Sequence, residues 1–158
     1  MPRPVCIVLC ESVLQDKDRN LASLFNLVER ITLHIAKAAD RSKQVVVRSG
    51  RPSFSILVTW MREDEDQGKE FDVEAVFIGP NKKPTADPIP GTFTFTKPFQ
   101  RLLYNLEGAP PLKEAGVHSV RARIKESGKG NRWLSQHYPF LVEIHRVPDE
   151  VNSNEQHD

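Results

Sequence analysis

Residues 117–126 read Val-His-Ser-Val-Arg-Ala-Arg-Ile-Lys-Glu, and apolar and basic side chains alternate through most of this stretch. The apolar positions are Val120, Ala122 and Ile124, and the basic positions between them are Arg121, Arg123 and Lys125. Successive side chains of a β-strand point to opposite faces of its sheet. This stretch therefore predicts a strand with one buried face and one exposed, basic face.

Turn residues and runs of β-branched or aromatic residues predict more short strands on both sides of this one. Residues 53–61 are largely apolar, and residues 71–78 begin with alternation and end wholly apolar. The acidic turn at residues 63–68 lies between them, so the two strands are predicted to form a hairpin. Shorter candidates are residues 45–47, 92–97, 99–106 and 138–147.

Residues 21–35 fit two kinds of element. One face of a helix would carry Leu21, Leu24, Phe25, Val28, Ile31 and Ile35. One face of a strand, interrupted by Glu29, would carry Leu21, Ser23, Phe25, Leu27, Ile31, Leu33 and Ile35. Periodicity alone leaves both alternatives open.

The number and spacing of these elements predict a mostly-β fold. About seven to nine short strands with at most one short helix indicate an antiparallel β-sandwich. Residues 114–120 follow the layout of the tyrosine corner of immunoglobulin-like domains, with His118 at the corner and Val120 in the core. An imidazole, like a tyrosine hydroxyl, can bond the backbone, and Trp60 suits the buried tryptophan of such a core. The prediction is one immunoglobulin-like domain over residues 1–148 and a polar tail at residues 149–158.

Two groups of short segments, one near each end of the chain, carry a family resemblance. The first group is Cys10-Glu11-Ser12-Val13, Asp16-Lys17-Asp18 and Ser23-Leu24-Phe25-Asn26-Leu27-Val28-Glu29-Arg30-Ile31. The second is Pro110-Pro111-Leu112, Glu114-Ala115-Gly116 and Tyr138-Pro139-Phe140-Leu141-Val142-Glu143-Ile144. Together they resemble a family of small, uncharacterised bacterial β-sandwich proteins of immunoglobulin-like type and unknown function. The resemblance spans most of the chain and implies that residues 21–31 form a strand, and it implies no reaction.

Size and charge exclude several classes of protein. The chain has 158 residues, of which 39% are hydrophobic and 27% charged, and its net charge is +1. This composition is typical of a globular domain, and the charge provides no overall attraction for nucleic acid or an anionic membrane. No apolar run approaches the roughly 18 residues that cross a bilayer, so no membrane partner is expected.

The two cysteines, Cys6 and Cys10, indicate a reducing compartment. On one strand their Cα atoms would lie about 13 Å apart, which is too far for a disulfide. Two thiols that cannot pair predict a cytoplasmic protein. Apolar neighbours predict that both are buried, inert thiols with a normal or raised pKa.

No catalytic, cofactor or metal site is predicted. The histidines His34, His118, His137, His145 and His157 lack the spacing of zinc ligands. Residues 63–66 offer carboxylates to calcium, but a single short loop supplies all of them, which favours a solvated turn. Residues 127–130, Ser-Gly-Lys-Gly, lack the spacing of a phosphate-binding loop and join two strands, so a hairpin turn is expected.

The basic stripe is the only organised charge pattern in the sequence. The candidate partner-binding residues are Arg121, Arg123, Lys125, Lys129 and Arg132. Such a stripe can follow a phosphate backbone while Trp133 or Tyr138 stacks on bases. The competing explanation is an ordinary exposed sheet face that acids such as Glu143 neutralise from neighbouring strands.

A non-catalytic, intracellular binding module is the preferred function, with an unknown protein or small ligand as its partner. Its candidate surfaces are the proline-rich loop at residues 80–90, the basic stripe and the charged segment at residues 37–51. The alternatives are a nucleic-acid-contacting accessory protein that uses the basic strand face, or an enzyme of unrecognised type. A homo-oligomer that assembles through exposed edge strands is a further hypothesis.

Overall fold

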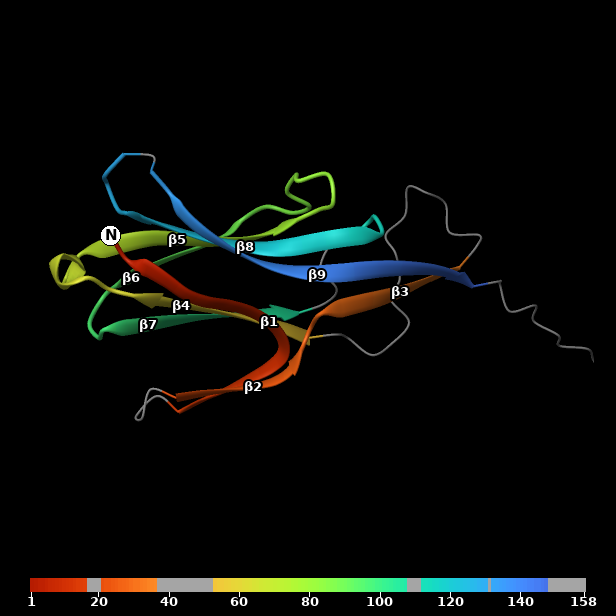
Figure 1. Ribbon diagram of the computed structural model, residues 1–158, viewed down its shortest axis with the longest axis horizontal. Helices are drawn as coiled ribbons and strands as arrows, with labels where there is room; N and C mark the ends of the chain where they lie inside the picture. Colours follow the sequence, from red (N-terminus) through yellow and green to blue (C-terminus); the bar gives the residue numbers. More distant parts are fainter. Residues whose placement is uncertain (17–20, 37–52, 108–111, 131, 148–158) are drawn as a thin grey trace, which may run out of the picture.

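Two β-sheets form the protein in the computed structural model, which describes residues 1–16, 21–36, 53–107, 112–130 and 132–147 (Figure 1). Over these ranges the chain forms nine strands, one short 3-10 turn and no α-helix, which confirms the mostly-β prediction. The strands are β1 (Arg3–Asp16), β2 (Leu21–Leu27), β3 (Arg30–Ala36), β4 (Ser53–Met61), β5 (Glu70–Ile78), β6 (Ile89–Thr94), β7 (Phe99–Glu107), β8 (Gly116–Glu126) and β9 (Leu134–Val147). The 3-10 turn, η1 (Asp64–Asp66), lies between β4 and β5.

The strands divide into a four-stranded sheet in the order β2-β1-β4-β7 and a five-stranded sheet in the order β3-β9-β8-β5-β6. Figure 1 shows them as two layers, with β1, β4 and β7 in one and β5, β8 and β9 in the other. The strand β3 runs parallel to β9, so the prediction of a wholly antiparallel fold is wrong at this edge. The reason is that β3 continues in the direction of β2 after the chain changes sheets, without a reversing turn.

One hydrophobic core fills the space between the sheets. Trp60 and Ile56 of β4 are fully buried from one side, and Phe71 of β5 is fully buried from the other. On β8 the apolar positions are buried as predicted: Val120, Ala122 and Ile124 are 0%, 3% and 0% exposed. The basic positions of β8 consequently point away from the core.

Residues 21–36 form strands, so the helical alternative is wrong, and the chain changes sheets in their middle. The Val28 N–H donates to the Leu9 carbonyl of the four-stranded sheet at 2.9 Å. The next residue, Glu29, offers its carbonyl to the Leu141 N–H of the five-stranded sheet at 2.8 Å. The interruption of the strand pattern at Glu29 therefore marks the crossing point.

The predicted hairpin of residues 53–61 with residues 71–78 is wrong, because β4 and β5 belong to different sheets. Stacked sheets lie about 10 Å apart, and the intervening residues, including η1, span that gap. The strand β4 pairs instead with β1 and β7, while β5 pairs with β6 and β8. The expected burial of β5, half-exposed at its start and buried at its end, is confirmed.

Several predictions fall outside the described residues. They concern the strand at residues 45–47, the charged segment at residues 37–51, the polar tail at residues 149–158 and His157.

Candidate functional site

The basic stripe of β8 lies on the outer face of the five-stranded sheet, directly beside acidic residues of β5. Arg123 is opposite Glu74, and Lys125 is opposite Asp72. The Arg123 Nε donates to a Glu74 carboxylate oxygen, and the Lys125 Nζ lies 3.5 Å from Asp72 Oδ2. Two of the five candidate cations are thus neutralised across the strands.

The neutralising acids come from β5 and not from β9, so the expectation for Glu143 is wrong. Its carboxylate lies 3.5 Å from the Arg30 guanidinium of β3 and 3.9 Å from His145 Nε2. The reason is register: Glu143 lies opposite Thr32 of β3, beyond the part of β9 that pairs with the stripe.

Trp133 lies against the stripe. The guanidinium carbon of Arg123 is 4.4 Å from the centroid of the Trp133 ring, and the Lys125 Nζ is 5.1 Å from it. Both are cation–π contacts. Tyr138 faces the opposite way and packs against the core. The Trp133 ring therefore contacts two cations of its own chain. Tyr138, the other candidate stacking residue, packs against the core.

The remaining cations differ in their surroundings. The Lys129 Nζ lies 2.7 Å from Glu126 Oε1, and Arg132 is exposed. Arg121 lies opposite the buried Val76 on one side and His137 on the other, and its Nε has no hydrogen-bond partner in the described part of the chain. Arg123, Lys125 and Lys129 are thus paired with acids of the same chain.

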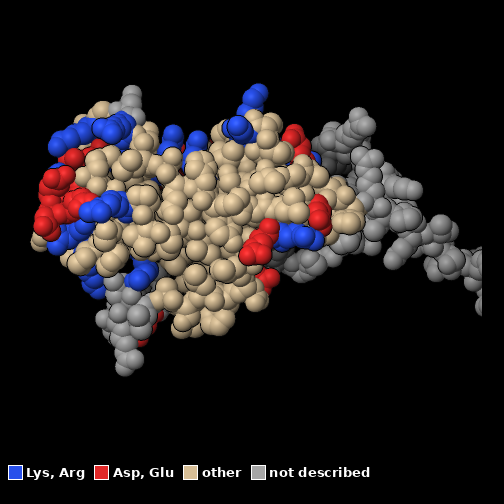
Figure 2. Space-filling model, in the orientation of Figure 1, with Lys and Arg blue, Asp and Glu red and all other residues tan. Residues whose placement is uncertain are grey.

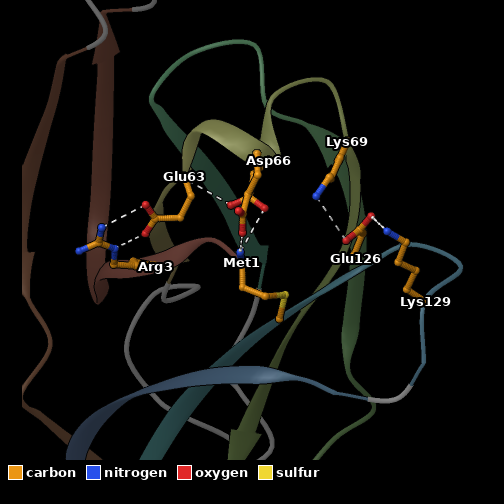
Figure 3. A network of polar contacts seen from close by, with 8 residues as sticks. Met1, Arg3, Glu63, Asp66, Lys69, Glu126 and Lys129 are labelled. Atoms are coloured by element: carbon orange, nitrogen blue, oxygen red, sulfur yellow. Dashed lines mark hydrogen bonds and ion pairs between the residues drawn. The ribbon is translucent and has the colours of Figure 1, made fainter.

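The acidic turn at residues 63–66 lies at the end of the molecule where β5 begins, and the carboxylates of Glu63, Glu65 and Asp66 contact positively charged groups of the same chain (Figure 3). Arg3 donates to both carboxylate oxygens of Glu63, and these hydrogen bonds hold the pKa of Glu63 below its ordinary value. Asp66 is 1% exposed, accepts from the Glu63 backbone N–H at 3.0 Å and lies 3.3 Å from the Met1 amino group. Figure 2 shows acidic and basic side chains mixed at this end, while the middle of the same face carries few charges.

A pocket lies at the other end of β5, where the loop after that strand meets the first residues of β8. Its volume is about 200 Å³, and it is partly open to solvent. The lining residues are Gly79, Pro80, Asn81, Pro84, Thr85, Lys113, Glu114 and His118. In Figure 1 this loop lies beside β8, at the end of β5 remote from η1.

His118 is the one buried polar side chain in this lining. It is 1% exposed, and its ring lies 5.8 Å from that of Phe140. The Nδ1 atom is 3.2 Å from the Gly116 carbonyl oxygen, which confirms that the corner histidine bonds the upstream backbone. The Nε2 atom is buried, and no described residue gives it a hydrogen bond. One ring nitrogen of His118 therefore has a hydrogen-bond partner among the described residues, and the other has none.

The loop that forms the pocket wall is held in one conformation by its own hydrogen bonds. The Gly79 N–H donates to the Lys83 carbonyl at 2.8 Å, and the Lys83 N–H donates to Asn81 Oδ1 at 2.9 Å. The Thr85 N–H donates to the Phe77 carbonyl at 2.9 Å, which ties the loop back to β5. Gly116, at φ +128°, lets the first residue of β8 approach Pro80: a Cβ built there would lie 3.2 Å from the Pro80 Cβ. The pocket is therefore preformed.

The thiols lie on the four-stranded sheet. Cys10 is buried, its Sγ donates to the Ser55 carbonyl at 3.6 Å, and burial raises its pKa, as expected for an inert thiol. Cys6 is free and only partly buried, so its predicted burial is wrong in degree. No group of three or more metal-ligating side chains occurs among the residues that the structure describes.

The two parts of the pocket are predicted separately from the sequence, the loop at residues 80–90 as a candidate surface and His118 as a structural residue. Lys113 and Glu114 are not among the candidate residues of the sequence. The missing information is the strand pairing. Ile78 lies opposite Ser119, and this pairing brings the end of β5 beside the start of β8.

No protein-family model and no curated protein sequence matches the chain. In the described part of the chain no helix has the length and apolar character needed to cross a membrane.

Proposed function

We propose that the protein is a non-catalytic binding module that takes a small ligand in the His118 pocket. The observation that carries this proposal is the hollow of about 200 Å³ between the loop after β5 and the start of β8, whose wall is held by hydrogen bonds of its own.

The size of the pocket restricts the ligand. Sites for drug-sized molecules commonly have volumes of about 300–1,000 Å³. The pocket of this protein, at about 200 Å³, suits a compact molecule of a few heavy atoms. A nucleotide or a large cofactor exceeds it.

The chemistry of the lining supports binding over catalysis. Nucleophilic catalysis needs a hydroxyl or thiol within reach of a base. The only hydroxyl among the lining residues belongs to Thr85, and its Oγ1 donates to the Phe77 carbonyl at 3.4 Å. His118 uses Nδ1 on a backbone carbonyl, without a carboxylate to orient it as in a catalytic triad.

The nucleic-acid alternative has less support. Arg123, Lys125 and Lys129 are paired with acids of the same chain, and Trp133 is engaged by two of these cations. A nucleic acid would have to displace these partners before it gained phosphate contacts.

We also propose a more specific fold class for the protein. An immunoglobulin-like β-sandwich, related to the small bacterial family that the sequence resembles, is supported by the backbone bond of His118 and by the fully buried Trp60. The parallel pair of β3 with β9 would be an addition at the sheet edge. The two free thiols support a reducing, cytoplasmic location.

A fragment screen by thermal denaturation tests the binding proposal. A ligand that binds only the folded state raises the free energy of unfolding by RT ln(1 + [L]/Kd), where [L] is its free concentration. The midpoint temperature of thermal denaturation rises accordingly. Compact polar fragments should stabilise the wild-type protein and should lose this effect in His118→Phe. The matched control is His137→Phe, which changes a histidine on the outer sheet face and should keep the effect. Stabilisation that survives His118→Phe, or that is lost in His137→Phe, would overturn the proposal.

A further inference from the structure

The strand β2 forms one outer edge of the four-stranded sheet. It pairs with residues 10–16 of β1, and nothing in the described part of the chain pairs with its other edge. The strand β4 accompanies β1 only as far as Cys10, so residues 12–16 and 21–25 form a ribbon of two strands. In Figure 1, β2 lies at the margin of the molecule that is remote from β5 and β8. A ribbon of two strands is only marginally stable in water without further cover.

Apolar side chains are exposed on both faces of this ribbon. Leu24 and Phe25 are neighbours in β2, so they point to opposite faces, and they are 37% and 49% exposed. Leu14 and Leu27 are 65% and 54% exposed. These four are half of the eight large apolar side chains that are exposed among the described residues. Such a cluster, unlike scattered exposed residues, marks an interaction surface.

The free edge of β2 lacks the features that keep edge strands from pairing with other chains. Its sequence, Leu-Ala-Ser-Leu-Phe-Asn-Leu, contains no charged residue and no proline. The edge strands at the other three borders of the two sheets do contain them: Arg30 in β3, Pro90 in β6 and Arg101 in β7. Charged side chains and proline protect an edge against a further strand. Of the four described edges, β2 is therefore the one without this protection.

The pairing of β2 with β1 shows which backbone groups β2 presents at its free edge. The Val28 N–H donates to the Leu9 carbonyl, and the register keeps the same offset from Leu27 back to Leu21. Residues of an antiparallel ladder alternate in the direction of their backbone groups. Leu24 therefore directs its N–H and C=O towards β1, whereas Ser23 and Phe25 direct theirs to the free edge.

We propose that β2 pairs with β2 of a second copy of the chain, antiparallel and about a two-fold axis at Ser23. The two ribbons then join into one four-stranded sheet, which gives each of them the further strands that stability requires. A two-fold contact uses the same surface on both partners, so an uncharged, unpaired edge is met by an identical one. Asn26, at φ +53°, ends the regular part of the edge, and residues 21–25 pair with themselves in this arrangement.

The charges around β2 permit this pairing. The acids of the described ribbon, Glu11 and Asp16, lie on β1 and not on β2. Three strand spacings, about 14 Å, separate β1 of one copy from β1 of the other, which exceeds the Debye length of about 8 Å at physiological salt. Glu11 also accepts from Asn26 Nδ2 at 2.7 Å. Backbone hydrogen bonds and apolar contacts therefore hold the dimer, and its affinity should change little with salt.

The size of the contact sets its strength. The strand β2 has seven residues, whereas a standard protein interface uses about 20–30 residues on each side. A weak dimer is therefore expected, with a dissociation constant in the micromolar range, on the order of 10–100 μM. The contact is separate from the His118 pocket, which lies beside β5 and β8, so this inference goes beyond the proposed function and does not depend on it.

Sedimentation equilibrium over a range of about 5–500 μM protein tests the inference. The wild-type protein should dimerise, and Phe25→Lys, which places a charge on the edge, should weaken the dimer at least about tenfold. Ser23→Pro removes an N–H at the free edge and leaves those that face β1, so it should weaken the dimer as well. The matched control is Val117→Lys on β8, which replaces another exposed apolar side chain, 62% exposed, and should leave the dissociation constant unchanged.

A second measurement uses the wild-type protein alone, so it does not depend on the folding of a variant. Amide hydrogen exchange at Ser23 and Phe25 should slow as the protein concentration rises from about 5 to 500 μM, while exchange at residues 79–85 stays constant. A chain that stays monomeric at about 500 μM would overturn the inference and leave the β2 edge to a partner of another kind. A dimer that Val117→Lys weakens as much as Phe25→Lys would also overturn it. Neither result bears on ligand binding in the His118 pocket.

Discussion

The guanidinium of Arg123 is held between two groups of different chemistry: its Nε donates to the Glu74 carboxylate, and its carbon lies 4.4 Å from the centroid of the Trp133 ring. Lys125 lies over the same ring at 5.1 Å. Trp133 precedes β9, whereas the two cations belong to β8. The indole therefore links the start of β9 to β8 through two side chains that the sequence marks as candidate partner-binding residues.

The first prediction concerns this contact. Trp133→Leu keeps an apolar side chain but removes the π system, and it should lower the free energy of unfolding by about 1 kcal/mol. Urea denaturation at low and high salt measures the change. Arg132→Ala, on the exposed neighbour, is the control and should change stability by less than about 0.5 kcal/mol. Equal effects of the two variants would show that the ring contact contributes nothing specific.

The second prediction concerns His137. Partial desolvation, with a further effect of the nearby Arg121 charge, lowers the pKa of His137 below its ordinary value. Arg121→Gln should raise this pKa part of the way back, because burial remains. An NMR titration of the ring protons measures both values. A lowered pKa means that the unfolded state binds more protons, so this residue's contribution to stability should decline as the pH falls below about 6.5.

The third prediction concerns Tyr104. Burial, with a smaller effect of Glu74, raises its pKa to about 12. The folded state thus keeps its phenol proton at a pH where the unfolded state, with a pKa of about 10, loses it. The free energy of unfolding should consequently fall as the pH rises from about 10 towards 12. Ultraviolet titration of phenolate absorbance in wild type and Tyr104→Phe checks this, and a Tyr104 that ionises near pH 10 would contradict it.

The fourth prediction concerns the close approach of Gly116 to Pro80. Gly116→Ala adds a Cβ at φ +128°, 3.2 Å from the Pro80 Cβ, and should cost about 1–3 kcal/mol of stability. Gly128→Ala is the matched control, because Gly128 also has a positive φ of +73° but no atom within 4 Å of its built Cβ. The control should cost about 1 kcal/mol or less. Chemical denaturation of both variants measures the two costs, and their difference combines the Pro80 contact with the greater backbone strain of alanine at φ +128°.

Sequence patterns predicted those features of the fold that depend on local alternation. The buried face of β8 follows from Val120, Ala122 and Ile124, and the break between β2 and β3 falls at Glu29, where the alternation fails. Which strands share a sheet depends on pairing between residues far apart in the sequence, so local patterns did not predict it. The chain at residues 62–69 reads as a hairpin turn, yet it connects two sheets, because β4 gains its partners from β1 and β7.

In the candidate site, too, local alternation predicted some features, and others depend on strand pairing. The alternation of β8 predicted that its cations share one face, but the acids that neutralise them stand at the register positions of β5. The pocket depends on two segments, residues 79–85 and 113–118, that are separate in sequence and meet only after β5 pairs with β8. The spacing around His118 predicted that its ring bonds the backbone, and Nδ1 does so, whereas the lack of a described partner for Nε2 is a property of the packed structure.

A map of amide shifts on adding compact polar fragments to the ¹⁵N-labelled protein tests the central claim most directly. The account predicts shifts confined to residues 79–85 and 112–118, around the pocket that His118 lines. Shifts confined to Arg121, Arg123 and their neighbours on the outer face of β8, or no shifts at any fragment concentration, would contradict it.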